Sequence, residues 1–170
     1  HSEVKLFYRY GGSFFGTMTD TNKWVEMYQS PRLETVIGQD VWLTPEMRFA
    51  DIILPACTNF ERDDISECGS SGGYSQHAGS GCNRRIIVMQ KKCIEPLYES
   101  KSDYQIFAEL AGRLGFKDEY TEGLDERGWA KRFFDYSDAP KYISWEEFYE
   151  KGYFVVPMPE DYKPTPAFRW

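Results

Sequence analysis

Cysteine, histidine and long apolar runs are scarce in this chain of 170 residues. No two of its four cysteines stand in Cys-x-x-Cys spacing, which argues against a structural zinc or iron–sulfur site. A reduced, intracellular setting is the simplest interpretation, and a disulfide remains an open alternative. His77 is the only histidine besides His1, and a loop histidine is more often solvated than catalytic.

Several classes of protein are excluded by what the chain lacks. No apolar run approaches the ~20 residues that span a membrane, and the start at His1 is neither basic nor followed by an apolar stretch, so we expect no signal peptide. The 20 basic and 27 acidic residues give a net charge of −7, which argues against nucleic-acid binding. We expect a cytoplasmic protein, with a periplasmic location left open.

Two short apolar runs stand out in the first third of the chain. Val36 and Ile37 lead to Gln39 and Asp40, and a second run covers residues 52–54. Uninterrupted apolar runs are typical of parallel strands buried on both faces of a sheet. Because ligands bind beyond the carboxyl ends of such strands, Gln39, Asp40 and the segment 57–64 mark a candidate site.

A strand, a glycine turn and a helix precede the first of these runs. Residues 4–8 predict the strand, Gly11 and Gly12 the turn, and Asp20 or Thr21 the start of a helix that ends near Ser30. Together with the next strand this is a βαβ unit. The two glycines permit a tight turn and the approach of backbone N–H groups to an anion, although a plain structural turn remains an alternative.

The charged segment after residue 56 also has two interpretations. Arg62 could pair with a neighbouring carboxylate, or its planar fork could bind a phosphate or a nucleobase. Further on, residues 86–89 predict a strand, and Ser102 and Gln105 have the spacing of a capping box that opens a helix ending at Gly115.

These patterns predict an α/β fold: a doubly wound, mostly parallel sheet (Rossmann-like) with helices on both faces. Helices are also expected over residues 124–134 and from Ser144 onward. We expect one domain over residues 3–152, followed by an extended, proline-containing linker over residues 153–170. No complete Gly-x-Gly-x-x-Gly and no Walker-type motif is present.

Four segments in this order resemble the large subunits of the dimethyl sulfoxide reductase family: Tyr10–Phe14, Ala50–Pro55, Glu61–Ile65 and Ser102–Phe107. The members of that family are molybdenum or tungsten enzymes that carry bis-molybdopterin guanine dinucleotide. Residues 8–14, 56–62, 92–96 and 151–157 are similar to a branch that transfers hydroxyl groups on polyhydroxylated aromatic compounds.

The resemblance implies that this region is the third domain of the catalytic subunit and holds one of the two guanine dinucleotides. It assigns seven residues to cofactor binding: Gly11, Gly12, Ser13, Gln39, Asp40, Arg62 and Asp103. The first three match a phosphate-side turn, in which many relatives have Asn at the place of Ser13. Asp103 could accept hydrogen bonds from guanine N1–H and the exocyclic amine, while Arg62 meets phosphate or ribose.

The same resemblance implies that the metal ligand, any iron–sulfur cysteines and the remaining cofactor-binding domains lie outside this chain. The isolated chain is then expected neither to turn over substrate nor to retain the cofactor. Its partners would be the other domains of the same subunit and a small iron–sulfur electron-transfer subunit. Two alternatives remain: a self-standing, non-catalytic nucleotide-binding module, and a structural or interaction domain whose charged loop is merely solvated.

Overall fold

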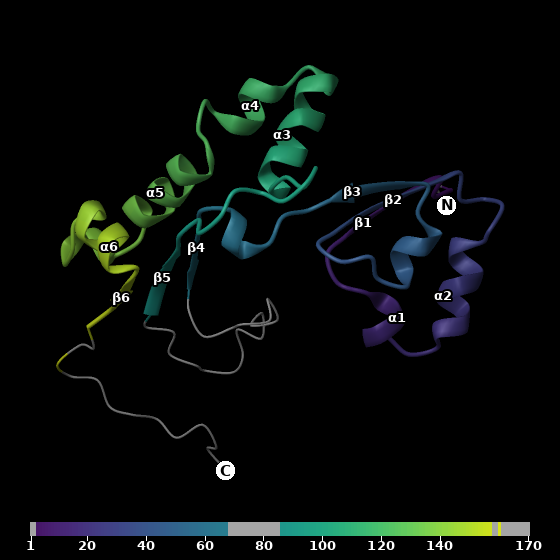
Figure 1. The fold of residues 1–170 in the computed structure, drawn as a ribbon, viewed down its shortest axis with the longest axis horizontal. Helices are drawn as coiled ribbons and strands as arrows, with labels where there is room; N and C mark the ends of the chain where they lie inside the picture. Colours follow the sequence, from purple (N-terminus) through teal and green to yellow (C-terminus); the bar gives the residue numbers. More distant parts are fainter. Residues whose placement is uncertain (1–2, 68–85, 158–159, 161–170) are drawn as a thin grey trace, which may run out of the picture. The chain divides into compact units, whose positions relative to one another are not determined.

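The computed structural model describes residues 3–67, 86–157 and 160, which belong to two compact units (Figure 1). The first unit is drawn from residues 1–61 and 94–122, and the second from residues 62–93 and 123–170. The chain leaves the first unit and later returns to it, so each unit is built from two separated segments.

The first unit contains a three-stranded parallel sheet in the order β1-β2-β3: β1 (Leu6–Tyr10), β2 (Thr35–Asp40) and β3 (Ile52–Pro55). In the register of the sheet Tyr10 lies opposite Gln39, and Asp40 lies opposite Pro55. The carboxyl ends of all three strands therefore meet at one edge. The prediction of an α/β fold with parallel strands is confirmed for this unit.

Helices and 3-10 turns connect these strands and follow them: α1 (Phe14–Thr17), α2 (Thr21–Tyr28), η1 (Glu46–Phe49), η2 (Asn59–Glu61), α3 (Asp103–Leu114) and α4 (Lys117–Thr121). The Phe7 ring contacts Tyr28 of α2, whereas the Tyr8 and Tyr10 rings contact Phe107 of α3. Because successive strand residues point to opposite faces, α2 and α3 pack on opposite faces of β1. The doubly wound strand order remains a prediction.

The predicted capping box at the start of α3 is confirmed. The Ser102 hydroxyl accepts the Gln105 N–H at 3.1 Å, and the Gln105 side chain accepts the Ser102 N–H at 3.4 Å. The helix ends at Gly115, whose φ of +89° lies in the left-handed region. This cap places Asp103 in the first turn of α3.

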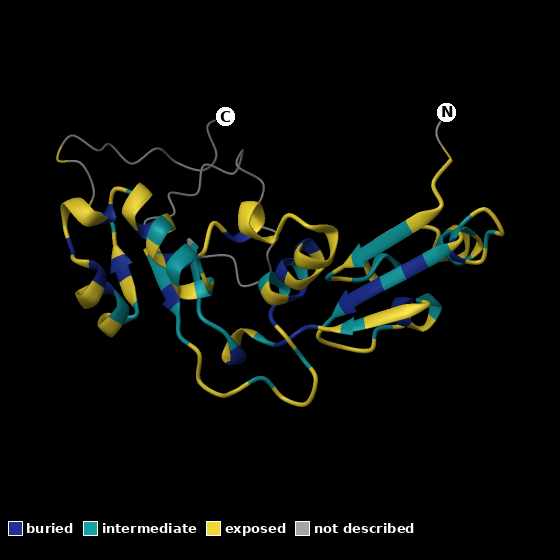
Figure 2. Cartoon of the chain, turned by 90° about the horizontal axis from the view of Figure 1, so that it is seen from above, coloured by how far each residue is buried: buried dark blue, intermediate teal, exposed yellow. Residues whose placement is uncertain are grey.

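Strand β3 corrects the expectation of a second buried run. Ile52 and Ile53 are 49% and 46% exposed, and Figure 2 shows β3 mostly in the colour of exposed residues beside a largely buried β2. Among the described strands β3 pairs only with β2, so it is an edge strand of this sheet. Its end has a further backbone contact, because the Lys101 N–H donates to the Pro55 carbonyl at 3.2 Å. An apolar run indicates a strand but does not tell which layer covers it.

The second unit contains an antiparallel sheet in the order β4-β5-β6: β4 (Asp64–Glu67), β5 (Ile86–Gln90) and β6 (Tyr153–Val155). Its helical segments are α5 (Glu126–Tyr136), the 3-10 turn η4 (Ala139–Lys141) and α6 (Trp145–Lys151). Phe134, Trp145, Phe148 and Phe154 lie in a core that also contains Met89 of β5. The predicted strand at residues 86–89 and the two predicted helices are confirmed.

Three features of the second unit differ from expectation. Its sheet is antiparallel, although a mostly parallel sheet was predicted, and Asp64–Glu67 form a strand that was not predicted from the sequence. Three of the four residues in this strand are polar, so Ile65 is the only apolar residue by which the sequence could have indicated a strand. Tyr153–Val155, expected at the start of an extended linker, pair with β5. The domain boundaries at residues 3–152 and 153–170 remain predictions.

No helix in the described part of the chain has both the length and the apolar character that crossing a membrane requires. Cys57 is a buried thiol and Cys93 an exposed one. Cys68, Cys82 and His77 lie outside the described residues.

Candidate functional site

The predicted glycine turn directly follows β1 at the carboxyl edge of the parallel sheet. Gly11 and Gly12 have φ angles of +55° and +68°, a conformation that L-residues with a side chain rarely adopt. A Cβ at Gly11 would meet no atom within 4 Å, so backbone conformation rather than space requires glycine there. The Gly11 N–H donates to the Gln39 carbonyl at 3.0 Å and so ties the turn to β2.

The backbone donors of this turn divide into satisfied and unsatisfied groups. The Gly11 N–H binds Gln39, and the Phe14 N–H donates to Glu46 Oε2 at 2.6 Å. Within the described residues the N–H groups of Gly12 and Ser13 have no hydrogen-bond partner, and the Ser13 hydroxyl oxygen is buried without one. Consecutive backbone N–H groups in a turn of this kind form a concave site for an anion.

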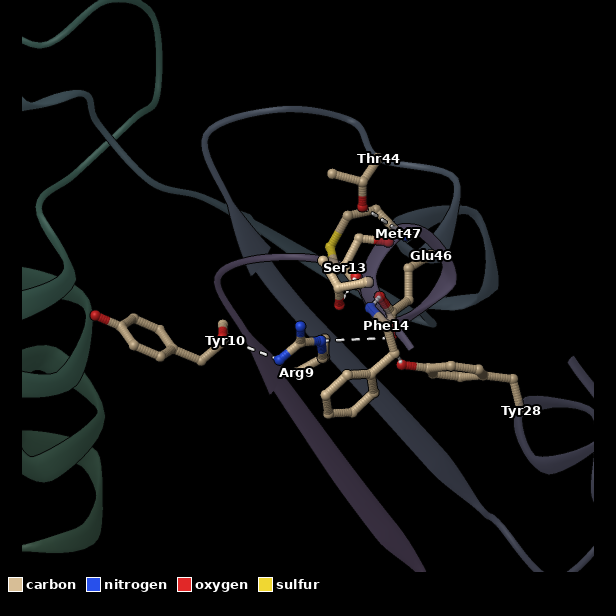
Figure 3. Close-up of polar contacts among 9 residues, drawn as sticks. Arg9, Tyr10, Ser13, Phe14, Tyr28, Thr44, Glu46 and Met47 are labelled. Carbon is tan, nitrogen blue, oxygen red and sulfur yellow. Dashed lines mark hydrogen bonds and ion pairs between the residues drawn. The ribbon is translucent and has the colours of Figure 1, made fainter. Parts of the chain in front are cut away.

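A buried carboxylate from η1 lies against the turn (Figure 3). The Glu46 side chain is fully buried, with 0% of its surface exposed, and its Oε1 lies 3.3 Å from Arg9 Nε. The Tyr28 hydroxyl donates to the same oxygen. Burial, and then this hydrogen bond, raise the pKa of Tyr28. The guanidinium of Arg9 stacks 4.0 Å from the centre of the Phe14 ring.

Gln39, at the end of β2, joins the sheet to the start of α3. Its side-chain amide is buried, donates to Asp103 Oδ1 at 2.7 Å and accepts from the Tyr8 hydroxyl. Burial and the negative charge of Asp103 raise the pKa of Tyr8. The structure therefore brings Gln39 and Asp103, which are far apart in sequence, into direct contact.

Asp40 follows Gln39 and ends β2. Its Oδ1 accepts the Trp42 N–H at 3.3 Å. Its Oδ2 is buried and has no hydrogen-bond partner in the described part of the chain. A buried carboxylate oxygen without a donor is costly, so this atom and the Ser13 hydroxyl are places where a ligand would relieve a penalty.

Arg62 belongs to the second unit, whereas the other six predicted site residues belong to the first. Its Nη2 lies 3.2 Å from Asp64 Oδ2, which matches the alternative in which it pairs with a neighbouring carboxylate. Its convergence with the other six residues remains a prediction.

Sequence reasoning missed Arg9, Tyr28 and Glu46. No local pattern marks Glu46 as buried, because a glutamate in the first turn after Pro45 is normally read as a solvated helix-dipole residue.

The Phe14 ring packs on Trp24 with centroids 4.5 Å apart, so it has a packing role in this unit. The described residues contain no group of three side chains that could hold a metal ion.

Comparisons with known proteins extend over the whole chain. The family model of molybdopterin oxidoreductases matches residues 1–113. The pyrogallol hydroxytransferase large subunit of Pelobacter acidigallici is 49% identical over 170 residues, covering 100% of this chain and 19% of that protein. A dimethyl sulfoxide/trimethylamine N-oxide reductase of Cereibacter sphaeroides is 39% identical over 182 residues, covering 99% of this chain and 21% of that protein.

A solved structure shares the fold. The acetylene hydratase from Pelobacter acetylenicus aligns with a TM-score of 0.65 over 93% of this chain and 19% of its own, at 19% sequence identity. At that identity the likeness concerns the fold alone. This chain spans about a fifth of the length of the curated relatives given above, at 19% and 21%.

Proposed function

Because this chain belongs to the molybdopterin oxidoreductase family, we propose that its first unit binds the guanosine diphosphate part of a molybdopterin guanine dinucleotide. The resemblance to the dimethyl sulfoxide reductase family is confirmed by the relatives that match the chain. The role of the individual residues is our proposal, and it is argued from the chemistry of the unsatisfied groups at the sheet edge.

One observation carries the proposal: donors and an acceptor without partners occur at the same carboxyl edge of the sheet. The N–H groups of Gly12 and Ser13, with the Ser13 hydroxyl, are suited to phosphate oxygens. Asp40 Oδ2 needs a donor, which the hydroxyl groups of a ribose supply. A nucleoside diphosphate carries both kinds of group. Leaving buried polar groups unpaired costs about 1–3 kcal/mol each, which a bound nucleotide would recover.

The base is assigned to Asp103. A carboxylate accepts two hydrogen bonds side by side, and guanine presents N1–H and the exocyclic amine in that arrangement, whereas adenine does not. Gln39 holds the Asp103 carboxylate through its 2.7 Å hydrogen bond. We assign Arg62 a supporting contact with phosphate or ribose, because its guanidinium suits such oxygens.

For the whole protein we propose hydroxyl transfer on polyhydroxylated aromatic compounds. The support is the 49% identity to a pyrogallol hydroxytransferase large subunit over the full length of this chain. The cofactor, in the bis-molybdopterin form with molybdenum or tungsten, supplies the redox chemistry, and the residues of this chain hold its nucleotide end. We further propose that the remaining domains of one large subunit and a small iron–sulfur subunit are the partners, in the cytoplasm.

The nucleotide assignment is tested on the intact protein purified with its cofactor. Mild acid should release about two GMP per metal ion, as the two guanine dinucleotides of the cofactor require, whereas release of AMP or CMP, or of no nucleotide, would contradict the assignment. Asp103→Ala should lower the GMP content, and Asp118→Ala, an exposed acidic residue in the first turn of α4, should not. Equal GMP in both variants would show that Asp103 does not bind the base.

A further inference from the structure

We propose that Glu46 is a positioning residue for the diphosphate turn Gly11–Ser13, an inference that rests on the proposed function. Glu46 comes from η1, between the second and third strands, and its side chain is fully buried. Its two oxygens are occupied by groups of the protein itself.

The carboxylate holds the chain on both sides of the turn (Figure 3). Oε2 accepts the N–H of Phe14, the residue directly after Ser13, at 2.6 Å. Oε1 lies 3.3 Å from Nε of Arg9, two residues before Gly11. One rigid buried group therefore fixes the entry and the exit of a turn whose two glycines would otherwise sample many backbone conformations.

We call the contacts of Glu46 with Arg9 and Phe14 the clamp. The clamp also determines which backbone N–H groups of the turn remain for a phosphate. The turn has four consecutive backbone N–H groups, from Gly11 to Phe14. The first donates to the Gln39 carbonyl and the last to the Glu46 carboxylate. The N–H groups of Gly12 and Ser13 remain for the ligand. Holding them in place before binding removes part of the ordering cost that a flexible loop would add to the binding free energy.

The charge of Glu46 is compatible with a nearby anion because Arg9 compensates it. The Arg9 guanidinium contacts both the carboxylate and the Phe14 ring, whose centre is 4.0 Å away, and the Arg9 side chain is only 14% exposed. The pair is neutral as a whole. Removal of the Glu46 charge would leave a buried cation uncompensated and the Phe14 N–H without its acceptor.

Three substitutions in the intact protein test this role. Glu46→Leu removes both acceptor oxygens, and Glu46→Gln removes the charge and replaces one acceptor oxygen by an NH2 donor. Tyr28→Phe removes a hydroxyl that donates to the same carboxylate and leaves the contacts of Glu46 with Arg9 and Phe14. The first readout is GMP content per subunit. The second is the rise in melting temperature from apoprotein, made in a host without the cofactor, to holoprotein, which reports ligand binding separately from intrinsic stability.

We expect nucleotide retention to fall about tenfold for Glu46→Leu and less for Glu46→Gln, with a smaller holo–apo difference in melting temperature in both. Tyr28→Phe should lower both melting temperatures equally and keep its GMP. If Glu46→Leu does not fold, the Gln variant decides by the same criteria.

The inference is overturned if the Glu46 variants keep the wild-type holo–apo difference, or if the Glu46 and Tyr28 variants lose GMP only in proportion to their loss of apoprotein stability. These outcomes leave the proposed function intact, because the wild-type protein still releases GMP. If the wild type releases no GMP, the proposed function fails, and the role of Glu46 fails with it.

Discussion

The two units of this chain bury different kinds of side chain. In the part of the chain that the structure describes, the buried polar residues all lie in the first unit: Gln39, Glu46, Glu61, Ser102 and Thr121. The second unit buries an aromatic and aliphatic cluster around Phe134 and Phe148, whose rings stack with centroids 4.9 Å apart. Buried polar groups cost stability unless they find partners. The difference agrees with the binding role that we propose for the first unit, whereas the second unit contains an apolar core.

The largest effect on stability is expected from a substitution in the core of the second unit. Phe148→Ala removes a ring that is 0% exposed, and should destabilise the protein by about 3–5 kcal/mol because of the cavity it leaves. Phe133→Ala, at a side chain that is 58% exposed, should cost less than about 1 kcal/mol. Thermal unfolding and limited proteolysis of the intact protein measure both. Equal losses would mean that burial does not govern stability in this unit.

The next effect should separate binding from stability. Asp40→Asn removes the charge of a carboxylate with a buried, unpartnered oxygen, so the apoprotein should melt at the same or a higher temperature. Nucleotide binding should weaken by about 1–3 kcal/mol. Asp20→Asn, at a carboxylate that is 48% exposed, is the control and should change neither quantity. Loss of apoprotein stability in Asp40→Asn would show that the carboxylate has a structural role instead.

A smaller effect is expected in the turn itself. Gly12→Ala places a side chain at a φ of +68° and should cost about 1–2 kcal/mol of apoprotein stability. Gly16→Ala lies within helix α1, where a Cβ meets no atom within 4 Å, and should be neutral or stabilising by up to about 1 kcal/mol. The melting temperature should therefore fall for Gly12→Ala and stay the same or rise for Gly16→Ala. A harmless Gly12→Ala would remove the argument for a strained turn.

The smallest effect is a pH dependence in the alkaline range. The pKa of Tyr28 is raised in the folded state by burial and by the hydrogen bond to Glu46. The folded protein therefore retains this proton when the unfolded chain loses it, and the stabilisation is fully present below the unfolded value of about 10 and lost as pH rises above it. Tyr28→Phe should flatten this loss in melting curves recorded across that range. An unchanged pH profile would assign the effect to other groups.

Local signals predicted local structure well. The capping box at Ser102, the left-handed Gly115 and the glycine turn follow from residue types at fixed spacings, and each is confirmed. The exposure of Ile52 and Ile53 and the antiparallel pairing of β4 were not predictable, because they depend on which distant segments form the next layer. An apolar run carries no information about its neighbours.

The candidate site shows the same division. Gly11, Gly12, Gln39 and Asp40 could be proposed from their position at the ends of short strands, whereas Ser13 was proposed from the family resemblance alone. The structure places the glycine turn beside the end of β2. The clamp by Glu46 could not be proposed, because its contacts join residues about thirty positions apart and no motif encodes them. The buried partners of a turn depend on the tertiary fold, whereas the turn itself depends on its own residues.

The interleaved path of the chain determines when the proposed site can be assembled. Gln39 belongs to the first segment of the first unit, and Asp103 to the segment that returns after residue 93. During synthesis the ribosome must translate residues 62–93, which belong to the second unit, before Asp103, the residue that we assign to the base, emerges. The diphosphate turn and the clamp are synthesised earlier, because Glu46 and its partners Arg9, Phe14 and Tyr28 all precede residue 62. The nascent protein would then acquire its phosphate-binding half first and its selectivity for guanine last.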